Sequence, residues 1–188
     1  MNFQNLKTSL VIFCNIISFN ILIAQNNEQF RVDNILKKYG AETKKINDIE
    51  FLIIKTDNTP KPTVLFITGS GFLPFFVNGR MGAFPFNVKE FKDKYNFVII
   101  SKPGIPLFVD SISNKHINFT LSEGYYLDTL GQIPKKFTEN NNLKYYTKSH
   151  NVVINYLSKQ SWVENDKLFL IGHSQGAHAA THIALNNK

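Results

Sequence analysis

Cysteine is almost absent from this sequence, and Cys14 is the one cysteine in 188 residues. It lies within an apolar N-terminal stretch and follows Ile12 and Phe13, whereas a lipoprotein signal would place small residues before the cysteine. We therefore interpret Cys14 as part of a signal-peptide core. A chain with one thiol forms no internal disulfide, so its stability must come from packing.

Charge is also sparse. Asp, Glu, Lys and Arg make up 19% of the residues and hydrophobic residues 43%, a composition that excludes a disordered tail protein and suffices for one core. The net charge is +7, but the lysines are scattered and form no run of five or more basic residues. This pattern predicts a generally basic surface, without nucleic acid as a partner.

The apolar stretch from Leu10 to Ala24 is about 15 residues long, too short to span a bilayer comfortably. Lys7 precedes it and no acidic residue occurs before Glu28. Residues 1–24 therefore predict a signal peptide, and the mature protein is expected to be periplasmic or extracellular and free of the membrane. An N-terminal anchor that is not cleaved is the alternative.

The rest of the chain, residues 25–188, alternates strand-like and helix-like segments. Unbroken apolar and β-branched runs predict buried strands, and apolar residues at helical spacing predict helices. This order indicates an α/β fold with a mostly parallel sheet flanked by helices. Residues 30–45 read as weakly helical, residues 56–62 as a turn, and 103–142 show no strong periodicity. The expected strands are Glu50–Lys55, Thr63–Ile67, Asn96–Ser101 and Leu168–Ile171, and the expected helices are Val88–Lys94 (with Asn87 and Glu90 as a capping box), Leu143–Leu157 and Ala177–Leu185.

The segment Gly172-His173-Ser174-Gln175-Gly176 stands between the last predicted strand and the last predicted helix. In this position it resembles the nucleophile elbow of the α/β hydrolases, in which a strained turn lifts a serine above the sheet. The residues around it resemble those of esterases, lipases and prolyl-oligopeptidase-like peptidases. The resemblance covers roughly residues 50 to 188. Gly172 and Gly176 would be the small residues that this crowded turn requires.

The resemblance implies a serine hydrolase that cleaves an ester, thioester or peptide bond of a small-molecule or peptide substrate through an acyl-enzyme on Ser174. The backbone N–H of Gln175 would be one oxyanion donor, and that of Ser70 or Gly71, in Thr68-Gly69-Ser70-Gly71, the second. Ser101-Lys102-Pro103-Gly104 resembles the turn after the next strand, with a structural role. No metal or organic cofactor is implied, and the oligomeric state is left open. An acyltransferase or haloperoxidase would use the same elbow.

The rest of a Ser–acid–His triad is missing. Family order places an acid and then a histidine after the serine, but only 14 residues follow Ser174 and none is acidic. His178 and His182 lie along the expected helix, where neither suits the role of base, and they lack a third partner for a metal site. We therefore expect a C-terminally truncated α/β-hydrolase domain that ends just after the elbow, and a chain that alone is inactive and poorly soluble. The alternative is a non-catalytic protein of this fold, or an inactive fragment with at most a binding role.

Overall fold

The computed structural model describes residues 31–82, 87–109, 117–118 and 125–187. The predicted signal peptide, residues 1–24, lies outside these ranges. The chain divides into two compact units, residues 1–38 and 39–188. In the first unit residues 31–38 are described, and they are helical. Among all the described residues, no helix has both the length and the hydropathy needed to cross a membrane.

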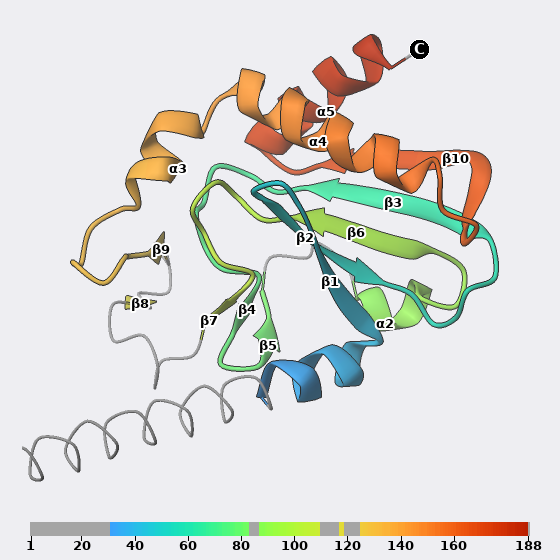
Figure 1. Ribbon diagram of the computed structural model, residues 1–188, viewed down its shortest axis with the longest axis horizontal. Coiled ribbons are helices and arrows are strands. Elements are labelled where there is room, and N and C mark those ends of the chain that lie inside the picture. The colour runs from blue at the N-terminus through green and yellow to red at the C-terminus, as the bar shows by residue number, and fades with distance from the viewer. Residues whose placement is uncertain (1–30, 83–86, 110–116, 119–124, 188) are drawn as a thin grey trace, which may run out of the picture. The chain divides into compact units, whose positions relative to one another are not determined.

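The second unit is built on a five-stranded sheet with the strand order β1-β2-β6-β3-β10 (Figure 1). The strands β6, β3 and β10 run parallel, whereas β1 and β2 form an antiparallel hairpin and β2 pairs antiparallel with β6. The predicted α/β architecture is confirmed, and the parallel half of the sheet is the half that carries the elbow. The bounds are β1 (Ala41–Ile46), β2 (Ile49–Ile54), β3 (Lys61–Ile67), β6 (Asn96–Ile100) and β10 (Val163–Gly172).

Two predictions at the start of this unit need correction. Residues 30–45 were expected to be weakly helical, but the helix ends at Tyr39 and β1 follows. Gly40, with φ +62°, ends the helix, and Asn47, with φ +56°, turns the chain back into β2. The turn expected over residues 56–62 is shorter, because β3 already begins at Lys61; Pro62 is tolerated near the start of a strand.

Two helices cover one face of the sheet: α4 (Leu143–Leu157), which has the predicted bounds, and α5 (Gln175–Asn186), slightly longer than predicted (Figure 1). Val153 and Leu157 of α4 pack into the main core, whose other buried members come chiefly from the strands. Ala179 and Ile183 of α5 pack with Tyr146 of α4. The buried sheet residues of the main core include Phe51, Ile53, Leu65 and Val98.

The opposite face carries α2 (Val88–Phe91), which is shorter than the helix predicted over Val88–Lys94. Asn87 caps this helix as predicted, because its side chain accepts a hydrogen bond from the Lys89 N–H. Its contact with Glu90 differs from that of a capping box, because it joins two side chains: the Asn87 amide donates to Glu90 Oε1 at 2.8 Å. The aperiodic segment 103–142 contains short elements rather than a continuous loop. The remaining elements are β4 (Phe76–Val77), β5 (Arg80–Met81), β7 (Phe108–Val109), β8 (Ile117–Asn118), β9 (Tyr125–Tyr126) and α3 (Lys135–Asn140).

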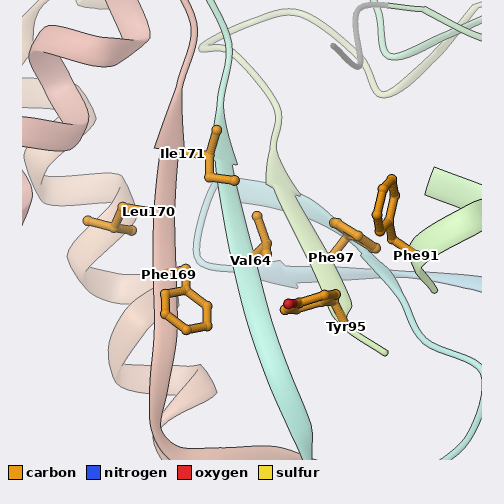
Figure 2. Close-up of a pocket in the computed structure, with 7 residues that line it drawn as sticks. All are labelled: Val64, Phe91, Tyr95, Phe97, Phe169, Leu170 and Ile171. Carbon is orange, nitrogen blue, oxygen red and sulfur yellow. The ribbon is translucent and has the colours of Figure 1, made fainter. Parts of the chain in front are cut away.

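The strand before the elbow lies at an edge of the sheet. Leu168–Ile171 has the apolar composition of a strand buried on both faces, but within the described residues β3 is the only strand beside β10. Phe169 and Ile171 are 47% and 39% exposed. They line an apolar groove of about 550 Å³ together with Val64 of β3, Phe97 of β6 and Phe91 of α2 (Figure 2). The strand is apolar on both faces, but only the face with Leu168 and Leu170 packs against the core.

This apolar edge should drive self-association, because exposed flat edges with apolar side chains pair with other chains. Replacing both Phe169 and Ile171 with Thr keeps β-propensity and removes the apolar surface, so the fraction of monomer in sedimentation velocity should rise. Leu130→Thr is the control, since Leu130 is 77% exposed but lies in the loop before α3. An unchanged sedimentation profile in the double variant would show that another surface associates.

A fully buried histidine lies on the inner face of α4. His150 is 3% exposed, and its Nδ1–H donates to the Tyr146 carbonyl at 2.7 Å. Burial lowers the pKa of His150 to about 4, because the charged ring would lose its hydration there. The ring is therefore neutral in the folded protein near pH 7 and acts as a packed core residue.

The free energy of unfolding should consequently depend on pH between about 6.5 and 4. The folded pKa lies below the ordinary value of 6.5, so the unfolded chain takes up the proton first as the pH falls. Stability is complete above pH ~6.5 and declines toward pH 4, by at most about 3 kcal/mol. Urea unfolding across this range should show the loss in the wild type and its absence in His150→Gln. His182→Gln, at an exposed site on α5, should retain it.

Candidate active site

The predicted elbow and the predicted oxyanion loop leave the sheet side by side. β10 and β3 are parallel neighbours, and Gly172 at the end of β10 is paired in register with Ile67 at the end of β3. The His173 N–H donates to the Ile67 carbonyl at 3.0 Å. The carboxyl ends of parallel strands share one edge of a sheet, so residues 68–71 and 173–176 meet there.

Ser174 occupies an unusual backbone conformation, with φ 53° and ψ −124°. Positive φ is costly for a residue with a side chain, by about 1–3 kcal/mol, and it is maintained only where the surroundings enforce it. Ser174 is the N-cap residue of α5, yet its side chain makes no capping hydrogen bond. The hydroxyl is thus exposed and not used to stabilise the helix.

The two elbow glycines lie in very close backbone contact. A Cβ added at Gly176 would stand 2.2 Å from the Ile67 carbonyl oxygen, and one added at Gly172 would stand 2.3 Å from the Gly176 oxygen. Real Cβ contacts do not approach this closely, so neither position accepts a side chain without movement of the backbone. The strand, strained serine, crowded glycines and following helix together have the form of an α/β-hydrolase elbow. The local geometry of the described chain therefore matches the elbow that the sequence led us to expect, at the carboxyl edge of an α/β fold.

A pocket of about 230 Å³ opens over the elbow. Its lining joins His173 and Ser174 to the loop Thr68–Gly71 and to the apolar segment Leu73–Phe75. Within the described residues, the backbone N–H groups of Gln175, Ser70 and Gly71 donate no hydrogen bond. N–H groups of this kind can donate to a bound anion, and the first turn of α5 adds a positive dipole end.

Gln175 has a second notable feature. Its side-chain oxygen, Oε1, is buried and has no hydrogen-bond partner in the described part of the chain. A buried acceptor without a donor is uncommon in folded proteins and costs free energy. The residue after Ser174 thus has both a backbone donor and a side-chain acceptor without partners.

The described histidines do not form a catalytic pair with Ser174. His150 is in the core, and His182 contacts Thr147 Oγ1 at 3.2 Å on the outside of α5. His173 lies beside Gly69, where an added Cβ would be 3.1 Å from Nδ1. Among the described residues no histidine bonds to the Ser174 hydroxyl and no group of three metal-ligand side chains gathers. His116 lies outside the described ranges.

Sequence reasoning missed one residue next to this site. Lys102, in the turn after β6, is buried at 6% exposure, and its Nζ donates a hydrogen bond to the Gly69 carbonyl. The turn itself was expected to be structural, and no sequence pattern indicated where the side chain would point. Its position depends on which strands are neighbours in the sheet.

No protein-family model and no curated protein sequence matches this chain. Solved structures similar to it include a 2,6-dihydroxy-pseudo-oxynicotine hydrolase (13% identity, TM-score 0.45, covering 83% of this chain and 38% of that one). A second is a putative acetyl xylan esterase from Bacteroides fragilis (16% identity, TM-score 0.43, covering 82% of this chain and 48% of that one). A third is an epoxide hydrolase from Vigna radiata (15% identity, TM-score 0.39, covering 78% of this chain and 34% of that one). The chain thus spans less than half the length of each. At this level of similarity, inference about function rests on the site itself.

The crowding at the elbow makes a direct prediction. Gly176→Ala should lower the free energy of unfolding by at least about 2 kcal/mol, because its Cβ would collide with the end of β3. Gly71→Ala is the matched control, since no atom lies within 4 Å of its added Cβ. Urea denaturation of both variants tests the difference. Equal stabilities would mean that the elbow does not pack against β3 in this way.

Proposed function

We propose that the protein is a serine hydrolase that cleaves an ester, thioester or peptide bond through an acyl-enzyme on Ser174. One observation carries the proposal. The strained Ser174 hydroxyl, which caps no helix, opens into a pocket that Ser70 and Gly71 also line. The backbone N–H groups of these two residues, and that of Gln175 next to the serine, donate no hydrogen bond in the described structure. This arrangement combines a nucleophile with donors for developing negative charge.

In the proposed reaction, Ser174 Oγ attacks the acyl carbon and its proton passes to a base. The N–H of Gln175 and an N–H of the 69–71 loop stabilise the oxyanion. The leaving group departs with the proton that the base took from Ser174. Water, deprotonated by the same base, then attacks the acyl-enzyme, the acyl–Oγ bond breaks, the carboxylic acid leaves, and the proton returns to Ser174 Oγ. Since no described histidine contacts Ser174, we propose that the base and its acidic partner lie outside the described residues. The scheme needs no metal or organic cofactor.

The pocket favours a small substrate. Its volume of about 230 Å³ is below the usual range for drug-sized ligands, and Leu73, Pro74 and Phe75 supply an apolar wall. We therefore propose a short, uncharged acyl group on a small-molecule ester or peptide, with no nucleic acid as a partner. We also propose that residues 1–24 direct export, so that the enzyme acts in the periplasm or outside the cell.

A fluorophosphonate probe on the full-length gene product tests the proposal, since it labels activated serines. Labelling should be abolished, at least ~100-fold, in Ser174→Ala. Ser70→Ala is the matched control: this serine lines the same pocket, and its replacement retains the backbone N–H. Labelling of Ser70→Ala should stay within about threefold of the wild type. Absence of labelling in a folded full-length protein would favour the alternative, a non-catalytic protein of this fold with a binding role.

A further inference from the structure

Lys102 is a buried cation that takes no part in the proposed reaction. It is 6% exposed, and within the described ranges no carboxylate lies within ion-pair distance of it. Its Nζ donates to the carbonyl oxygen of Gly69 and lies 5.8 Å and 5.7 Å from the ring centroids of Phe137 and Tyr146. The ammonium is thus held between two aromatic rings and one peptide oxygen (a cation–π arrangement).

The backbone around Lys102 is fixed by a tight turn. Lys102-Pro103-Gly104-Ile105 closes with a hydrogen bond from the Ile105 N–H to the Lys102 carbonyl at 3.0 Å. Pro103 sets φ at the second position, and Gly104 has the positive φ of +73° that a type II turn requires at the third. The side chain therefore starts from a rigid point at the end of β6, beside the end of β3.

The Gly69 carbonyl belongs to the same peptide unit as the Ser70 N–H. Because a trans peptide is planar, its C=O and N–H point in opposite directions. A hydrogen bond that fixes the Gly69 oxygen therefore also fixes the direction of the Ser70 N–H, on the side away from Lys102. A cationic donor on the oxygen also polarises the unit and makes the N–H a stronger donor.

We propose that Lys102 is a positioning residue that fixes the Gly69–Ser70 peptide, so that Ser70 rather than Gly71 supplies the second oxyanion donor. The inference rests on the proposed function for its catalytic meaning, whereas the orientation of the peptide stands on the contacts alone. A purely structural role would not require a charge. A side chain such as Met would fill the space between Phe137 and Tyr146 without the cost of burying an ammonium group.

The first test does not depend on activity. Backbone ¹⁵N relaxation should give the Ser70 amide an order parameter of ~0.85 in the wild type and below ~0.6 in Lys102→Met. Lys102→Arg, which keeps a cationic donor, should retain the order, as should Lys159→Met, a control at an exposed lysine in the turn that follows α4. Thermal unfolding of each variant checks that it is folded. A Ser70 amide that stays rigid in folded Lys102→Met overturns the proposal.

The second test measures hydrolysis of p-nitrophenyl acetate by the full-length product. Loss of one oxyanion donor reduces turnover by about 100- to 1,000-fold. In Lys102→Met the donor would be misdirected rather than lost, so kcat should fall about 10- to 100-fold. KM should change less than about twofold, because the donor acts mainly in the transition state. Lys102→Arg should recover most of the rate. An unchanged kcat in Lys102→Met overturns the proposal. If the wild type has no Ser174-dependent turnover, the proposed function fails, and the relaxation data still decide the role of Lys102.

A pH profile separates charge from packing. Burial lowers the pKa of Lys102 to about 8, so the wild-type kcat should fall as the pH rises above about 8. Lys102→Arg should lose this decline, because arginine stays protonated. Three other described titratable groups lie near Lys102. Burial raises the pKa of the Tyr146 hydroxyl to about 12. His150 bonds to the Tyr146 carbonyl, and His173 lies beside Gly69. If kcat declines above about pH 8 in Lys102→Arg as well, the charge of Lys102 is not the cause, and this part of the proposal is wrong.

Discussion

The elbow backbone lies directly against the end of β3, and this contact is the constraint on which the rest of the site depends. The space between Gly176 and the Ile67 carbonyl accommodates no side chain. The chain can pass there only because β10 and β3 are parallel and are paired in register from Leu168 and Thr63 to Gly172 and Ile67. The register brings the two strand ends level, and the glycines let the backbones touch. The turn that carries Ser174 is therefore positioned by main-chain contacts with β3.

Strain at Ser174 follows from the same contact. A positive φ on a non-glycine residue is unfavourable, and a free loop would relax it. Here the strand on one side and α5 on the other remove that freedom. The His173 N–H bonds to β3, and the Gly176 N–H bonds back to the His173 carbonyl at 2.9 Å. The packing of Ala179 and Ile183 keeps α5 on the sheet, so core burial holds the strained residue in place.

Much of this was predictable from sequence, and the reasons are local. The helix over Leu143–Leu157 shows its spacing directly, and the Gly-x-Ser-x-Gly pattern lies between a strand and a helix that each have a clear signature. Sequence patterns were less informative where the neighbouring strands determine the structure. An apolar run such as Leu168–Ile171 has the same composition at an edge as at the centre of a sheet. Residues 41–46, which had been expected to be helical, form a strand because β2 is available to pair with them. The hydrophobic periodicity of a sequence does not show which strands will be neighbours in the sheet.

Lys102 shows the same limit at the site itself. It is 33 residues from Gly69 and far from Ser174 in sequence, yet all three follow adjacent parallel strands, β6, β3 and β10. Parallel sheets gather their functional groups at the carboxyl edge because every strand ends there. In this chain the middle strand, β3, leads into the Thr68–Gly71 loop, β10 leads into the turn that carries Ser174, and β6 leads into the turn that carries Lys102. The β6-β3-β10 order thus places Lys102 and Ser174 on opposite sides of one loop, where a charge can orient the loop without occupying the pocket.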